Sequence, residues 1–392
     1  MFGSIYIGLS GLNAYSRGLK QVSNNVANLN SQGFKSSTVS FTDLFGARQS
    51  GGLSYAAGQG SPGHGVRIGD STLDMSAGEQ RQTDRDLDLA IDGSGFLMLM
   101  RGDEVAYTRT GSFEVDKDGY IVLSGSDYRL ATLDSSGQPV SLSIDMSGTS
   151  APKATSKVVF TNNLSADSAV PYDVGNIKVV YSDGAQHVWK ARFERVANVS
   201  GQWTATVTDE NGNSVGGSPQ TFRTISSRID PTTSVLKFTA GGGTVAFDLT
   251  GIDSFAGGNS STMGTSSVDG YPIGTITTLS VNKDGELEIG YSNEQKKQLG
   301  AVAVADFRDP QALEQRSGGL FTDMGGAGRQ LLSSADPRVG QVKSRTLEAS
   351  NVDLSREFGD LILIQRGFQA SSQIISVTND MIQQLFGIRG QG

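Results

Sequence analysis

The sequence of 392 residues contains no cysteine. Disulfide bonds, thiolate nucleophiles and cysteine-based zinc sites are therefore excluded. The sequence also has no apolar run of about 18 residues, the minimum for a membrane-spanning helix, so we expect no membrane insertion.

Basic residues are fewer than acidic ones. Lysine and arginine total 32 against 40 aspartate and glutamate residues, which gives a formal net charge of −8. Because a protein that binds phosphate backbones needs a basic surface, this balance argues against nucleic acid as a partner.

Histidines are too few, and too poorly placed, to suggest catalysis. His64 lies in a glycine-rich segment and His187 begins an expected strand, and no HExxH, GxSxG or P-loop motif occurs. The segments 116–120 (DKDGY) and 282–286 (NKDGE) resemble the start of a calcium loop. Both lack its glutamate at the twelfth position, so we expect hairpin turns there. We therefore expect no enzyme, no cofactor and no metal site.

The N-terminal segment is a poor Sec signal peptide. It lacks a basic region followed by an apolar core and a small-residue cleavage site. Export from the cytoplasm would then need another route.

Glycine is abundant, with 51 residues, or about 13% against a typical 7%. Short segments of period-two alternation, separated by Gly, Ser, Asp and Asn, follow from Asp86 and predict many short strands. We expect a discontinuous β domain over 70–145 and 276–345, with a second, outer β domain inserted as 146–275. Glycine- and serine-rich stretches at 46–65 and 257–267 suggest hinges.

Both chain ends carry helical apolar stripes, over residues 5–29 and 353–386. The predicted fold class is therefore mainly β with paired N- and C-terminal α-helices. The terminal segments 1–69 and 346–392 would form a helical polymerisation domain with its linker. The residues expected to pack between subunits are Leu12, Leu19, Val22, Val26, Leu29, Leu354, Phe358, Leu361, Ile362, Phe368, Ile375, Ile382 and Leu385.

Three features favour an assembly role for these helices. The C-terminal helix would be about 50 Å long, more than one small domain covers. Glycines in the N-terminal helix, such as Gly8, Gly11 and Gly18, each lower its intrinsic stability by about 1 kcal/mol. Most polar positions on both helices are uncharged. We expect the helices to be marginal alone and to order on assembly.

Several segments resemble the rod and hook family of flagellar axial proteins. NNVANLNSQGFKSSTVSFTDLF (24–45) is similar to that family's N-terminal signature, and residues 347–385 are similar to its C-terminal signature. LDLAIDGSGF (87–96) and YTRTGSFEVDKDGYIV (107–122) resemble its shared β segment, and 291–307 resembles a return segment of the hook branch. The family-motif positions are Asn25, Asn28, Gly33, Phe34, Lys35, Asn351, Asp353, Gln365 and Arg366.

The inserted β domain favours the hook branch over the distal rod branch of the family. The resemblance then implies a homopolymer, a curved hollow helical tube that acts as a flexible universal joint and transmits motor torque to the filament. It further implies an extracellular hook location, export by the flagellar type III apparatus, a hook cap protein during assembly, and contact with distal rod and hook–filament junction proteins. Two alternatives stay open: a distal rod-type protein, and a secreted β-rich hydrolase or carbohydrate-binding module.

Overall fold

The computed structural model describes residues 2–44, 65–145 and 148–389. Helix α1 spans Phe2–Ala27 and helix α2 spans Leu354–Arg389, and almost all other regular structure is strand. The expected fold class, mainly β with a helix at each end, is confirmed. The helix bounds lie within about three residues of the predicted ones, as is usual for frayed ends.

Local sequence explains where α2 begins. Asp353 is the N-cap, and its Oδ1 accepts hydrogen bonds from Ser355 N at 2.8 Å and Arg356 N at 3.3 Å. After α1, Gly33 adopts a positive φ of 64°, which favours glycine because it has no Cβ.

The chain divides into two compact units, each described here by itself. Unit 1 comprises 1–145, 279–288 and 298–392, and unit 2 comprises 146–278 and 289–297. The three-part division expected from the sequence stays a prediction.

The main sheet of unit 1 has twelve strands, with the central order β27-β28-β8-β7-β11-β10-β9-β6-β30. Their bounds are β6 Asp88–Asp92, β7 Phe96–Arg101, β8 Glu104–Thr108, β9 Thr110–Val115, β10 Ile121–Leu123, β11 Arg129–Leu133, β12 Pro139–Ser141, β26 Ala303–Phe307, β27 Leu313–Arg316, β28 Leu320–Asp323, β29 Arg329–Ser333 and β30 Gln341–Ser344. Phe96 packs edge-on against both Phe307 and Phe321 in its core. A short 3₁₀ helix, Pro310–Ala312, precedes β27.

Three two-stranded ribbons link the helices of unit 1 to this sheet. They pair β1 (Ser37–Thr38) with β4 (Thr72–Leu73), β2 (Phe41–Asp43) with β3 (Val66–Ile68), and β5 (Gln80–Gln82) with β31 (Thr346–Glu348). Strand β31 is followed after a short segment by α2, so the β5–β31 ribbon holds the start of that helix.

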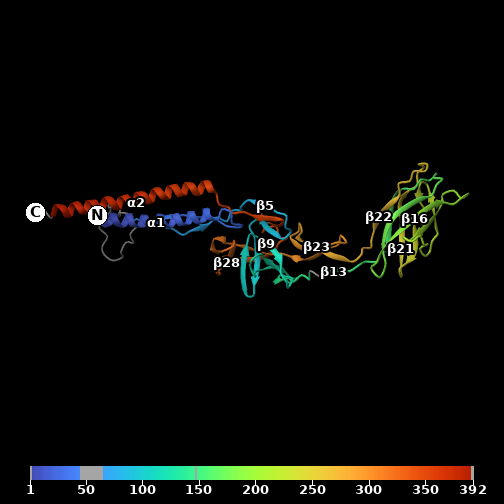
Figure 1. Ribbon diagram of the computed structural model, residues 1–392, viewed down its shortest axis with the longest axis horizontal. Coiled ribbons are helices and arrows are strands. Elements are labelled where there is room, and N and C mark those ends of the chain that lie inside the picture. Colours follow the sequence, from blue (N-terminus) through green and yellow to red (C-terminus); the bar gives the residue numbers. More distant parts are fainter. Residues whose placement is uncertain (1, 45–64, 146–147, 390–392) are drawn as a thin grey trace, which may run out of the picture. The chain divides into compact units, whose positions relative to one another are not determined.

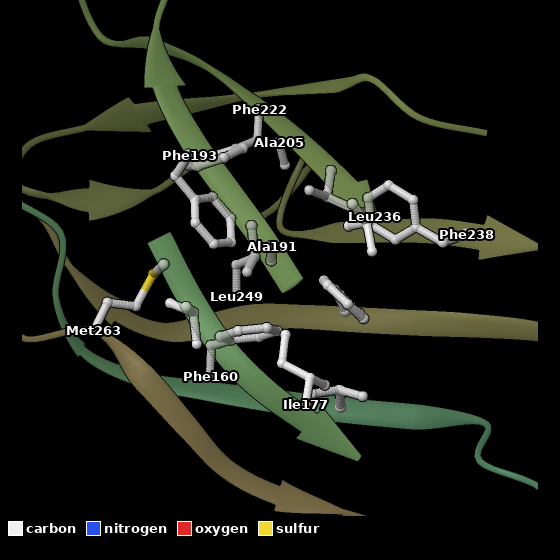
Figure 2. Packing of buried hydrophobic residues seen from close by; sticks show 14 of the residues in the cluster. Phe160, Ile177, Ala191, Phe193, Ala205, Phe222, Leu236, Phe238, Leu249 and Met263 are labelled. Atoms are coloured by element: carbon white, nitrogen blue, oxygen red, sulfur yellow. The ribbon is translucent and has the colours of Figure 1, made fainter. Parts of the chain in front are cut away.

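Unit 2 is built on a nine-stranded sheet around an aromatic core (Figure 2). The path runs β15-β16-β17-β18-β19-β21-β14-β22, with β20 paired to β21. The bounds are β14 Lys157–Asn163, β15 Tyr172–Val180, β16 Gln186–Arg195, β17 Gln202–Thr208, β18 Gln220–Ile225, β19 Arg228–Ile229, β20 Val235–Ala240, β21 Gly243–Asp253 and β22 Gly264–Val268. Strict alternation in β16 and β17 buries Trp189 and Trp203, the two tryptophans of the chain.

A further four-stranded sheet has the order β13-β23-β24-β25. Its strands are β13 Thr149–Ser150, β23 Gly274–Val281, β24 Glu286–Tyr291 and β25 Lys296–Ala301. The segments 116–120 and 282–286 are the turns between β9 and β10 and between β23 and β24.

The structure argues against a hinge at 257–267. Asp167 Oδ1 accepts hydrogen bonds from Gly257 N at 2.9 Å and Gly258 N at 2.8 Å, and β22 begins at Gly264. This stretch is therefore a bonded loop and a strand of unit 2. The other suggested hinge, 46–65, lies outside the described residues except at Gly65.

Candidate assembly surface

Helices α1 and α2 lie side by side and antiparallel, with both chain ends at the same end of the pair (Figure 1). Glycines of α1 lie at the contact between the two helices, which we call the glycine seam. A Cβ at Gly8 would stand 2.8 Å from Ile375 Cγ1, and one at Gly18 would stand 3.3 Å from Ile364 Cδ1. A Cβ at Gly11 would collide with Ser371 Oγ. The glycines that weaken α1 in isolation therefore allow the close approach of α2.

The predicted packing residues fall into three groups by exposure. Val22 is buried. Half-buried positions are Leu12, Leu19, Val26, Leu29, Leu361, Ile375 and Ile382. Exposed positions are Leu354, Phe358, Ile362 and Phe368, and the side chain of Leu385 lies outside the described residues.

The exposed members lie on the outer surface of the helix pair. Phe358 is 50% exposed and Ile362 is 52% exposed, one helical turn apart on α2. Further exposed apolar side chains, not among the predicted ones, are Tyr6, Ile7, Leu9, Leu363, Ile374, Val377 and Met381. We call this set, together with Leu354, Phe358, Ile362 and Phe368, the outer apolar surface. Large apolar side chains exposed in such number on two helices mark candidate interaction surfaces.

The motif residue Lys35 is part of a buried charge cluster in unit 1. Its Nζ lies 2.6 Å from Glu348 Oε1 and 2.6 Å from the carbonyl oxygen of Ser76. Arg109 Nε donates to Glu348 Oε2 at 3.3 Å, and Gly78 N donates to Glu348 Oε1 at 2.8 Å. Burial lowers the pKa of Lys35, and Glu348 opposes that shift. The cluster joins the segment after α1 to the strand before α2.

Asn25 links the two helices directly. Its Nδ2 donates to Glu357 Oε1 at 2.8 Å and to the Ser37 carbonyl at 2.9 Å, and its Oδ1 accepts from Ser37 N at 3.1 Å. Burial raises the pKa of Glu357, and the hydrogen bond from Asn25 opposes that shift. A single amide therefore holds α1, α2 and β1 together.

We call the hydrogen-bonded groups around Asn25 and Lys35 the polar junction. Some of the remaining motif residues belong to it and others do not. Asn351 accepts from Ser36 N at 2.8 Å and donates to the Asp74 carbonyl at 2.7 Å. Gly33 N donates to the Glu348 carbonyl at 2.9 Å. Asn28 bonds back to Asn24, Phe34 is half-buried, and Gln365 and Arg366 are exposed on α2.

The described residues do not form a metal-binding cluster. His187 stacks on Tyr181 with ring centroids 4.0 Å apart, and its Nδ1 lies 2.9 Å from Glu210 Oε1. His64 lies outside the described residues. Within 2–44, 65–145 and 148–389, no group of three or more His, Asp or Glu side chains is placed to hold a metal ion. Neither described helix combines the length and apolar character needed to cross a membrane.

Three family models match the chain. They are the flagella basal body rod protein model over 5–35, the flagellar hook protein FlgE/F/G D1 domain model over 90–159, and the flagellar basal body rod FlgEFG protein C-terminal model over 343–388. The first and third cover the two helices and most of the polar junction between them.

Curated relatives match along the whole length. The flagellar hook protein FlgE of Borreliella burgdorferi is 27% identical over 99% of this chain and 100% of that protein. The FlgE proteins of Salmonella typhimurium and Escherichia coli are 28% and 27% identical, each over 97% of this chain and 98% of the relative. These matches, along the whole length of the chain, support a flagellar hook protein. The same relatives support a structural subunit of the hook.

A solved structure, Helicobacter pylori flagellar hook protein FlgE2, aligns with a TM-score of 0.45 and 11% identity. The alignment covers 69% of this chain and 99% of that one. The curated hook relatives are structural proteins, which agrees with the absence of recognisable catalytic motifs from the sequence.

Proposed function

We propose that this hook subunit polymerises through its terminal helices into a curved hollow tube that acts as a flexible universal joint. The helix pair would form the inner wall, and the β units would form the outer layers. The joint would transmit motor torque to the filament while it bends. Contacts of this kind are heterologous, since one surface of each subunit meets a different surface of the next.

The outer apolar surface is the observation that carries the proposal. Phe368 is 42% exposed, Leu363 68% and Leu9 58%, although the same helices already bury a glycine seam between them. Burying such side chains against neighbours is worth about 25 cal/mol per Å² of apolar area. The polar junction around Asn25 and Lys35 is buried inside one chain, so the apolar surface remains for other copies.

The proposed partners follow from the family. They are other copies of this chain, a hook cap protein during growth, and distal rod and hook–filament junction proteins at the two ends. The chain would reach the distal end through the flagellar type III export apparatus and act outside the cell, without chemistry, cofactor or metal.

A substitution at Phe368 tests this proposal. Phe368→Asp should abolish polymerisation of the purified full chain and hook formation in cells, because a carboxylate cannot be buried there without a partner. Phe368→Leu, which keeps the position apolar, should still assemble. Tryptophan fluorescence, which reports on unit 2 alone, shows whether that unit remains folded in both variants. Normal hooks from Phe368→Asp would contradict the proposal.

A further inference from the structure

A groove of about 420 Å³ runs along α1 on the side where the β2–β3 ribbon lies. Tyr6 and Leu9 of α1 form one wall, and Leu44, Val66 and Ile68 of the ribbon form the other. Ser10 Oγ fixes the ribbon to the helix by accepting from Val66 N at 3.2 Å. The groove is therefore a built feature of unit 1.

The groove lining combines exposed apolar side chains with two cationic ones. Tyr6 is 61% exposed and Leu9 58% exposed. Arg17 and Arg67 also line the groove and are exposed, and neither guanidinium has an acidic partner among the described residues. Helix α1 itself contains no acidic residue. A ligand for this groove needs an apolar surface next to a carboxylate.

One segment of the chain presents that combination. On α2, Val377 is 46% exposed, Met381 is 52% exposed and Asp380 is exposed between them. No cation pairs with Asp380 in the described part of the chain. Residues 377, 380 and 381 lie on one face of the helix, because side chains three and four apart are neighbours.

The same chain cannot place this segment in its own groove. The antiparallel seam sets Gly8 against Ile375, so Met381 lies about 9 Å further along the axis than the level of Gly8. By the same alignment Asp380 is level with Gly3, about 21 Å along the axis from Arg17. We infer that the α1 groove receives the Val377–Asp380–Met381 face of α2 from a second copy, with Asp380 between Arg17 and Arg67. This inference rests on the proposed polymerisation and names one of its contacts.

Cross-linking tests the contact directly, since the chain has no cysteine of its own. Leu9→Cys combined with Met381→Cys should give intermolecular disulfide ladders in oxidised polymer and none in free chain. The two sites in one chain lie beyond the roughly 7 Å Cα separation that a disulfide spans. Leu9→Cys combined with Phe358→Cys is the matched control and should give no ladder.

Exchanging the charges of Asp380 and the two groove arginines tests whether their attraction holds the contact together. Arg17→Glu with Arg67→Glu, and separately Asp380→Arg, should each lower polymer yield about tenfold, as expected for a lost charge pair at an interface. Combining all three substitutions should restore most of the yield. Lys20→Glu changes an exposed cation outside the groove lining and should have little effect.

The outcomes separate this contact from polymerisation itself. Polymer that forms without a Leu9–Met381 cross-link, and without recovery in the charge exchange, would overturn the inference and leave the proposed function standing. A chain that never polymerises would overturn the proposed function instead. A cross-link in free chain between Leu9→Cys and a cysteine placed within 45–64 would show that the chain's own segment fills the groove, which would also overturn the inference.

Discussion

Lys35 and Glu348 are 313 residues apart in the chain, yet Lys35 Nζ lies 2.6 Å from Glu348 Oε1 and both side chains are fully buried. Lys35 follows α1, and Glu348 closes the strand that precedes α2. The pair therefore connects the two ends of the chain where the helices meet the β ribbon.

Removing one partner of this pair should lower the free energy of unfolding of unit 1. Lys35→Met leaves the Glu348 carboxylate buried with only Arg109 as a cation, so we expect a loss of about 3 kcal/mol in the free energy of unfolding of unit 1. Far-UV circular dichroism during urea unfolding measures it. Lys343→Met breaks an exposed pair with Asp92 and should cost less than about 1 kcal/mol. Equal losses in the two variants would refute the structural role of Lys35.

A second carboxylate at Asn25 should make the helix junction sensitive to pH. Asn25→Asp places a carboxylate about 3 Å from Glu357, so the pKa values of the pair rise in the folded state. A group whose pKa is raised by folding stabilises at low pH, and that stability is lost as pH rises through the folded value. The variant should therefore hold its helices at pH 4 and lose them towards pH 7.

Amide hydrogen exchange in α1 and α2 at the two pH values measures this effect. Asn25→Ala removes the same hydrogen bonds without adding charge and should show a much weaker pH dependence. The same pH dependence in both variants would mean that the carboxylate pair is not the cause.

The glycine seam predicts opposite effects for similar substitutions. Gly11→Ala should separate the helices, because the added Cβ would collide with Ser371 Oγ. In Gly359→Ala the added Cβ has no other atom within 4 Å. The Gly359 change should stabilise α2 by about 1 kcal/mol through helix propensity alone. Adding Ser371→Ala should recover part of the loss in Gly11→Ala, since it removes the colliding oxygen. Thermal melting of the helical signal ranks the variants, and stabilisation by Gly11→Ala alone would disprove the close seam.

The acid stability of unit 2 should depend on Asp248. The hydrogen bond from Lys157, 2.7 Å away, and the hydrogen bond from Thr250 lower the pKa of Asp248 to about 2. A depressed pKa contributes stability above the unfolded value of 3.8, and that contribution is lost as pH falls towards 2. Asp248→Asn should therefore cost about 1 kcal/mol at pH 7, and the difference from the native chain should shrink between pH 4 and pH 2.

Tryptophan fluorescence reads this change, because Trp189 and Trp203 are both buried in unit 2. Asp253→Asn serves as the control, since its pairing with Arg228 is largely exposed. A pH-independent loss in Asp248→Asn would show that its ionised pair with Lys157 is not responsible.

The sequence predicted the helices and the β class because both depend on local periodicity. Spacings of three and four placed α1 and α2, and alternation placed β16 and β17. The role of Gly8 and Gly11 was missed, because a glycine that weakens a lone helix looks the same in sequence as one that admits a neighbour. The contact between Lys35 and Glu348 joins residues 313 positions apart, which periodicity in the sequence cannot reveal. Lys35 could therefore be named only through the family motif.

The sequence also could not show which apolar helix residues pack within the chain and which are exposed. Ile375 and Phe368 belong to one broad stripe in the sequence, but Ile375 packs on Gly8 within the chain while Phe368 is exposed. Ile364, which is 4% exposed, lies in the seam and was not among the predicted packing residues. Periodicity gives the face of a helix, and the partner on that face follows only from the fold.

Electron microscopy of isolated flagella labelled with an antibody against residues 146–275 tests the central claim most directly. The hook assignment predicts label along the short curved segment between basal body and filament. Label confined to the straight rod, or no label on the organelle, would contradict it.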